Sequence, residues 1–111
     1  MKKSEKRLLE AKTQVLKALA HPTRLWITEK LKDGECCVNS LVEDVGADFS
    51  TVSKHLSVLK EAGILEDEKR GKQVFYTLKV PCVLSFMSCV EEVIQTRIKE
   101  QIGLLIKNDG E

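Results

Sequence analysis

The chain has 111 residues, of which 42% are hydrophobic and 32% are charged, and its formal net charge is +1. This length predicts one domain, residues 1–111, and the balanced composition excludes long disordered tracts and a basic field over the whole surface. No apolar run is long enough for a signal peptide or a membrane span, so we expect a cytoplasmic protein with no membrane partner and with reduced cysteines.

Two amphipathic helices are predicted in the first third of the chain. Residues 4–20 place apolar side chains at helical spacing, and Ser4 is the candidate N-cap. A second helix is expected to begin at Pro22, because proline is favoured in a first helical turn, and to end at Gly34. A mainly α-helical fold is therefore indicated.

The next segment predicts a helix-turn-helix. A short extended stretch at "ECCVN" leads to a third helix of about residues 40–45, because Ser40 and Glu43 have the spacing of a capping box. Asp48 can cap a fourth helix that ends at Gly63. The inward face of this helix has apolar side chains at i, i+4 and i+7, namely Val52, Leu56 and Leu59. The fourth helix is the one that would enter a major groove.

Two β-prone segments follow, residues 64–68 and 73–78, and "KRG" joins them into a hairpin with a cationic tip. The last segment predicts one helix of about six or seven turns, whose apolar residues form a stripe. They are Phe86, Cys89 or Val90, Val93 or Ile94, Ile98, Ile102 and Leu105. So small a domain cannot cover this stripe, so we expect the N- and C-terminal helices at a dimer interface. The predicted fold is mainly α with a small β-hairpin: a dimeric winged helix-turn-helix.

Several motifs, in this order, resemble one family. Over about residues 15–80 the sequence is similar to the signatures of the ArsR/SmtB family of metal- and metalloid-responsive repressors, in "LAHPTRLWI", "ECCVNSLVEDVG", "STVSKHLSVLKEAGIL" and "RGKQVFYTL". The resemblance implies a homodimer that binds double-stranded operator DNA and is released when a soft metal, arsenic(III), or an oxidising or sulfur species modifies its sensor. No enzyme is expected, because the sequence has no phosphate-binding glycine loop and no HExxH motif.

The outward face of the fourth helix predicts the DNA contacts. It carries short hydroxyl side chains beside one lysine and one histidine: Ser50, Thr51, Ser53, Lys54, His55 and Ser57. Hydroxyls can approach base edges or phosphates, and Lys54 can neutralise a phosphate or reach guanine. His55 either contacts DNA or is a packed or capping side chain. At the hairpin tip we expect Lys69, Arg70 and Lys72 to contact phosphates. The competing interpretations are an ordinary solvated helix face and a protein-interaction module.

The cysteines are the candidate sensor. In arsenic-sensing members of the family the sensor segment runs Glu-Leu-Cys-Val-Cys-Asp-Leu, and here the segment reads "ECCVNSL". The resemblance therefore matches Cys37 to the first sensor cysteine and places Asn39 where the second would be. The missing ligands can come from Cys82 and Cys89 of the last helix.

Helix geometry limits that ligand set. Seven residues of unbroken helix separate the thiols of Cys82 and Cys89 by about 10 Å, whereas two sulfurs on one ion are at most about 4.6 Å apart. Both can bind one ion only if the helix is interrupted between them. Pro81 makes Cys82 a thiol at a helix N-terminus, where the dipole favours the thiolate, whereas Cys89 falls on the apolar stripe and is expected to pack.

We therefore expect a thiophilic site that uses Cys37 with Cys36 and one cysteine of the last helix, Cys82 ahead of Cys89. Arsenic(III) is the favoured inducer because three thiolates satisfy its pyramidal coordination, and another soft metal ion would also suit thiolates. No constitutive cofactor is expected. Thiol oxidation or persulfidation is the alternative sensing chemistry, and cysteines that are merely buried or incidental are the non-functional interpretation.

Overall fold

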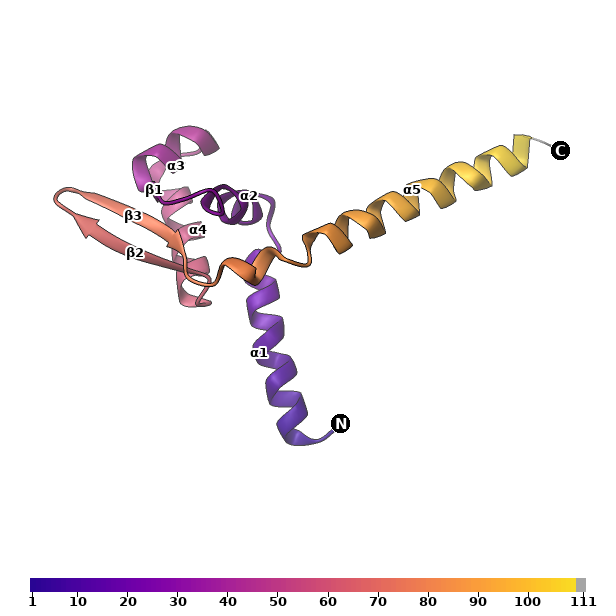
Figure 1. The fold of residues 1–111 in the computed structure, drawn as a ribbon, viewed down its shortest axis with the longest axis horizontal. Helices are drawn as coiled ribbons and strands as arrows, with labels where there is room; N and C mark the ends of the chain where they lie inside the picture. Colours follow the sequence, from indigo (N-terminus) through magenta and orange to yellow (C-terminus); the bar gives the residue numbers. More distant parts are fainter. Residues whose placement is uncertain (110–111) are drawn as a thin grey trace. The chain divides into compact units, whose positions relative to one another are not determined.

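The computed structural model describes the backbone of residues 1–109 and the side chains of residues 1–106. It divides into two compact units, one of residues 1–81 and one that begins at Cys82. Figure 1 follows the chain through them, from the N-terminal helix in indigo to the C-terminal helix in yellow. The first unit holds the elements that the sequence predicts for DNA binding.

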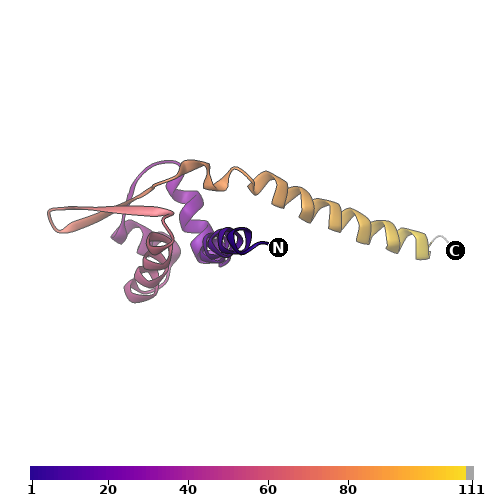
Figure 2. The ribbon, with the colours of Figure 1, turned by 90° about the horizontal axis from the view of Figure 1, so that it is seen from below.

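The first unit combines helices with a small antiparallel sheet. Its helices are α1 (Lys3–Leu19), α2 (Pro22–Leu31), α3 (Val38–Val45) and α4 (Phe49–Glu61). Its strands are β1 (Cys36–Cys37), β2 (Leu65–Arg70) and β3 (Gln73–Leu78), in the order β1-β3-β2. Figure 2 shows the β2–β3 hairpin edge-on, with α3 and α4 on one side of it. This is a winged helix-turn-helix, as predicted: α3 and α4 form the helix-turn-helix, and the hairpin is the wing.

The core of this unit lies where α4 packs against α2, α3 and the base of the wing. The buried apolar side chains come from all of these elements: Ile27, Leu31, Leu41, Val52, Leu56, Leu59, Ile64 and Leu65. The inward face of α4 is no more than 1% exposed, which confirms the predicted periodicity. Burying each such side chain contributes about 1.5–3 kcal/mol. The outward face of α4 is thereby fixed in orientation.

Two helix starts differ from the predicted ones. The N-cap of α1 is Lys2 rather than Ser4, and it makes no side-chain cap hydrogen bond. Helix α3 begins at Val38, so the predicted capping box at Ser40 is wrong. The reason is tertiary: β1 pairs with β3 as far as Cys37, and the helix begins as soon as this pairing ends. The Cys37 side chain makes no cap hydrogen bond, because a thiol is a weak acceptor.

The first wing strand, β2, extends further toward the tip than predicted, whereas β3 has the predicted bounds. The register pairs Arg70 with Gln73, which leaves only Gly71 and Lys72 in the turn. Gly71 has φ +63°, as the first central position of a type II′ hairpin turn requires. Lys69 and Arg70 therefore belong to strand β2, and only Lys72 lies at the tip itself.

The C-terminal segment forms two helical pieces rather than the predicted single helix. A short 3₁₀ helix, η1 (Pro81–Leu84), precedes α5 (Met87–Asp109). The amide of Ser85 donates to the Cys82 carbonyl at 3.0 Å, three residues back, whereas the amide of Val90 donates to the Phe86 carbonyl at 3.2 Å, four residues back as in an α-helix. The tighter hydrogen bonding of η1 does not continue into an α-helix, so a new helix begins after Phe86. Cys82 and Cys89 thus lie in separate helical pieces.

Helix α5 carries the predicted apolar stripe, and the stripe is exposed in the single chain. Its side chains range from 38% to 64% exposed: Phe86, Val90, Val93, Ile94, Ile98, Ile102 and Leu105. Within residues 1–109, no helix has both the length and the apolar character needed to cross a bilayer. The expected dimer interface at this stripe stays a prediction.

Candidate functional site

The outward face of α4 is open to solvent where the sequence predicts DNA contact. Four of its polar side chains are exposed: Ser50, Thr51, Lys54 and Ser57. The other two, Ser53 and His55, are half-buried. Among the described side chains, Lys54 takes part in no ion pair. Its ammonium group is available to a phosphate or a base edge.

Asp48 fixes the start of α4. Its Oδ1 accepts a hydrogen bond from the Thr51 amide at 2.8 Å and from the Ser50 hydroxyl at 3.3 Å. The hydrogen bonds from Thr51 are the main cause that lowers the pKa of Asp48, so the carboxylate stays charged beside the positive end of the helix dipole. The predicted cap is confirmed, and it holds the first turn of the candidate recognition helix.

His55 packs against a second histidine. The ring centroids of His21 and His55 lie 4.5 Å apart, with the rings tilted by 41°. His21 is itself the N-cap of α2, because its Nδ1 accepts a hydrogen bond from the Thr23 amide at 3.1 Å. Burial lowers the pKa of His55, and the charges of His21 and Arg24 lower it further. The His55 ring is thus packed against His21, and a DNA contact by His55 stays a prediction.

The predicted basic residues of the wing have different surroundings. Lys69 and Lys72 are exposed and form no ion pair among the side chains of residues 1–106. Arg70 instead makes a bidentate ion pair with Glu35, at 2.7 and 2.9 Å, and a further hydrogen bond with Glu68 at 2.9 Å. Its guanidinium is engaged within the protein, so Lys69 and Lys72 are the wing cations that remain available for phosphates.

Cys36 and Cys37 lie side by side in β1 but face opposite ways. Cys36 pairs with Tyr76 and Cys37 with Phe75, and successive side chains of a strand point to opposite faces of a sheet. Burial raises the pKa of the Cys36 thiol, and the nearby Lys30 offsets this only in part. Cys36 is therefore mainly a neutral thiol at pH 7, because burial disfavours its charged form.

Cys37 lines a small cavity beside the DNA-binding elements. The cavity has a volume of about 90 Å³ and lies between the first turns of α3 and α4 and the tip of the wing. Its lining residues are Cys37, Val38, Asn39, Phe49, Lys72, Gln73 and Val74. The residue matched to the family's first sensor cysteine thus borders a space that α4 and the wing also line.

Cys82 and Cys89 belong to the second unit, and both are exposed. Cys82 lies in the 3₁₀ helix η1 and not at the N-terminus of an α-helix. The short η1 does not supply the long-helix dipole that was predicted to favour its thiolate. Across the described residues, no three His, Cys, Asp or Glu side chains gather closely enough to hold a metal ion. The predicted site of Cys37, Cys36 and one cysteine of the C-terminal segment therefore stays a prediction.

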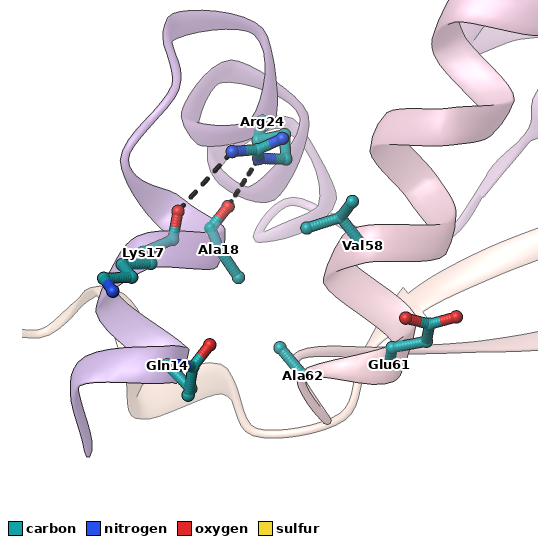
Figure 3. Close-up of a pocket in the computed structure, with 7 residues that line it drawn as sticks. All are labelled: Gln14, Lys17, Ala18, Arg24, Val58, Glu61 and Ala62. Carbon is teal, nitrogen blue, oxygen red and sulfur yellow. Dashed lines mark hydrogen bonds between the residues drawn. The ribbon is translucent and has the colours of Figure 1, made fainter. Parts of the chain in front are cut away.

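A cleft that the sequence does not indicate lies between α1, α2 and the C-terminal end of α4. It has a volume of about 500 Å³, and Figure 3 draws its lining: Gln14, Lys17, Ala18, Arg24, Val58, Glu61 and Ala62. Arg24 donates to the carbonyls of Ala18 at 2.8 Å and Lys17 at 3.5 Å, so it satisfies the open end of α1 and ties it to α2. The sequence held one signal for this contact. Arg24 lies in the first turn of a helix, where the helix dipole disfavours a positive charge unless hydrogen-bond acceptors are near.

Comparisons with known proteins bear on the same segments. The profile of the family described as bacterial regulatory protein, arsR family, matches residues 21–67. A biofilm growth-associated repressor of Xylella fastidiosa (strain Temecula1 / ATCC 700964) is 34% identical over 96 residues, which cover 86% of this chain and 83% of that protein. The chain belongs to the ArsR/SmtB family.

Further relatives of this ArsR/SmtB-family protein agree in fold. The solution structure of the homodimeric winged helix-turn-helix DNA-binding domain Mb0332 from Mycobacterium bovis has a TM-score of 0.74 at 27% identity, and the match covers 90% of this chain and 93% of that one. The HTH-type transcriptional repressor SmtB of Mycobacterium tuberculosis (strain H37Rv) is 38% identical over 71 residues, 64% of this chain. The match spans only 53% of the SmtB repressor, about half its length.

The family profile covers only part of the candidate site of this ArsR/SmtB-family protein. The matched residues include His21, Cys36, Cys37 and the whole of α4. Residues of the wing tip and of the C-terminal segment lie outside it: Lys69, Arg70, Lys72, Cys82 and Cys89. The family match therefore bears on the recognition helix more directly than on the complete cysteine set.

Proposed function

We propose that this ArsR/SmtB-family protein is a transcriptional repressor that binds double-stranded operator DNA as a homodimer. The observation that carries the proposal is the exposed hydroxyl and lysine face of α4, opposite a face that is fully buried. Two relatives are named as repressors, and the Mb0332 domain is described as homodimeric and DNA-binding. The residues 1–111 act in this proposal as one DNA-binding domain.

In the proposed complex, α4 enters the major groove, which is wide enough to admit an α-helix. Ser50, Thr51 and Ser57 lie against base edges or phosphates, and Lys54 contacts a phosphate or guanine. Lys69 and Lys72 contact the backbone beside the groove, where they add affinity without sequence information. The dimer forms through the exposed apolar stripe of α5 together with α1, so that two recognition helices face successive turns of one duplex.

Replacing Lys54 with alanine tests the DNA-binding surface. Affinity for a duplex recovered from a random pool is measured at several salt concentrations for the intact dimer. Loss of one phosphate contact per subunit, two in the dimer, is expected to weaken binding and to reduce the salt slope by about 1.8. Lys32→Ala, at the end of α2 and off the α4 face, is the matched control and should leave the slope unchanged. Equal slopes for the two variants and the natural sequence would contradict the proposed contact.

We further propose that a thiophilic inducer releases the DNA, with arsenic(III) favoured over other soft metal ions. Cys37 is the central ligand, together with Cys36 and one cysteine of the C-terminal segment, Cys82 ahead of Cys89. Support comes from the position of Cys37, whose cavity adjoins the recognition helix and the wing tip. Mass spectrometry of the protein treated with arsenite tests this directly: one arsenic per subunit, removed by a dithiol chelator, is the expected result.

Cysteine oxidation or persulfidation is the second candidate. It is favoured by the exposure of Cys82 and Cys89, because reagents in solution can reach both thiols. This chemistry leaves a sulfur–sulfur link that a reductant reverses, whereas bound arsenic leaves the number of oxidised thiols unchanged. The mass of the protein before and after DNA release by peroxide, polysulfide or arsenite therefore separates the two candidates, because bound arsenic adds the mass of arsenic, whereas a disulfide loses two hydrogens and a persulfide gains sulfur.

A further inference from the structure

Arg70 lies on the face of the wing that points away from α4. Side chains alternate along β2, and Asp67 forms an ion pair with Lys60 of α4 at 3.0 Å. The neighbouring positions Glu68 and Arg70 therefore project from the opposite face. Figure 2 shows the helices on one side of the hairpin only, in agreement with this alternation. Arg70 is thus placed to act on the sheet itself and not on the recognition helix.

The Arg70 guanidinium contacts all three strands of the sheet or their immediate flanks. It holds Glu35, which directly precedes β1, through two hydrogen bonds of 2.7 and 2.9 Å, and Glu68 of β2 through one of 2.9 Å. It also lies 4.7 Å above the ring of Phe75 in β3. These hydrogen bonds lower the pKa of Glu35 and raise that of Arg70, so the pair stays charged. Only arginine combines bidentate pairing with stacking on an aromatic ring.

The cysteine strand is the element that this contact restrains. Glu35 is covalently joined to Cys36, and the thiols of Cys36 and Cys37 leave β1 on opposite faces. Two sulfurs that share one centre must approach to about 4.6 Å or less. Strand β1 must therefore twist out of its pairing with β3 before both thiols can bind one arsenic atom.

We propose that Arg70 is a positioning residue that couples chemistry at Cys36 and Cys37 to the wing within a single subunit. When β1 leaves β3, Glu35 is drawn away from Arg70, and the tie across the sheet is lost. Lys69 of β2 and Lys72 of the wing turn then shift relative to α4, and the surface offered to DNA changes. This inference rests on the proposed function and specifies how its inducer response reaches the DNA-binding surface.

Phenylarsine oxide is a suitable probe because it takes two thiols. Two arsenic–sulfur bonds form, the arsenic–oxygen bond is lost, and the two thiol protons leave with that oxygen as water, while arsenic remains trivalent. In the Cys82→Ser, Cys89→Ser double variant, the remaining thiols are Cys36 and Cys37. In this background the probe is expected to lower DNA affinity by about tenfold or more, within the range of coupling between two sites.

Glu35→Gln in the same background is the decisive comparison. Without the probe, this variant is expected to bind DNA about fivefold more weakly than the background, which is the largest effect expected from loss of an exposed ion pair. Adding the probe should then lower its DNA affinity by less than about a further twofold. Glu66→Gln removes an exposed carboxylate of β2 that has no ion pair among the described side chains, so it should respond as the background does. Arg70→Lys keeps the charge but not the bidentate contact, and should behave like Glu35→Gln.

Three results would overturn the inference. The first is an equal effect of the probe with and without Glu35. The second is a salt slope lowered by about 1.8 in the Arg70→Gln dimer, because Arg70 would then be a phosphate contact itself in each subunit. The third does not depend on DNA: hydrogen exchange of the wing amides, residues 65–78, should accelerate on probe binding, and unchanged exchange would exclude the coupling. Failure of the proposed function alone would appear differently. Neither salt nor the probe would then change DNA binding, but hydrogen exchange of the wing amides would still accelerate on probe binding.

Discussion

The rings of His21 and His55 lie 4.5 Å apart and join the N-cap of α2 to the middle of the recognition helix. Burial depresses the pKa of His55, and a proton on it would also face the charges of His21 and Arg24. Protonation therefore opposes the packing that orients α4. The pair makes α4 sensitive to acid through its packing against the start of α2.

The first prediction follows from the direction of this shift. Because the folded-state pKa of His55 is below 6.5, the unfolded chain binds the proton more readily than the folded one. The contribution of His55 to stability is therefore complete above pH 6.5 and declines as the pH falls toward the folded-state pKa. Denaturant unfolding of the natural sequence should show this decline, and His55→Gln should lack it. A pH dependence common to both would show that other groups are responsible.

The recognition helix is the part of the fold that local sequence rules predict best. The spacing of Val52, Leu56 and Leu59 gives the buried face, and Asp48 supplies its own cap, so no distant residue is needed to define α4. The start of α3 could not be predicted in this way, because it depends on the pairing of Cys37 with Phe75 of β3. Where strand pairing determines the position at which a helix begins, local capping signals do not predict that position.

The wing illustrates the same limit at the candidate site. The triplet "KRG" marks a turn, but the strand continues through Arg70 because the register places only Gly71 and Lys72 between the strands. The partner of Arg70 is Glu35, which no local spacing connects to it. The role of His55 was open for a related reason, since its neighbour His21 belongs to another helix. Charge and residue type identified these positions, and only the tertiary fold separated the side chains that contact other residues of the protein from those that do not.

A second prediction concerns the support of α4. Leu56 is 1% exposed in the core, so Leu56→Ala should leave a cavity and lower the free energy of unfolding by about 2–5 kcal/mol. Val58 lies on the same helix with its side chain 38% exposed, and Val58→Ala should cost less than about 1 kcal/mol. Chemical denaturation of both variants measures the difference. Similar losses would mean that α4 does not pack as described.

A third prediction separates sensing from DNA binding. Cys37→Ser should bind the selected duplex with unchanged affinity but fail to release it on addition of arsenite, because the central ligand of the proposed site is missing. Cys89→Ser removes an exposed thiol of α5 and should still respond, since Cys82 is the preferred third ligand. Fluorescence anisotropy of a labelled duplex follows both. Normal release from Cys37→Ser would remove Cys37 from the inducer site.

The last prediction tests what covers α5. Ile98 is 50% exposed in the single chain and lies in the middle of the apolar stripe, so in the proposed dimer its side chain meets the partner subunit. Ile98→Glu would bury a carboxylate from each subunit without a partner, and the dimer dissociation constant should rise by about 100-fold or more. Sedimentation velocity at several protein concentrations measures the change.

Thr96→Glu places the same charge about 200° around the helix from Ile98, at 100° per residue, and should remain dimeric. DNA affinity should fall with the loss of the dimer, because one subunit reaches only one half-site. A monomeric natural protein, or an Ile98→Glu variant as dimeric as Thr96→Glu, would show that the stripe has another role.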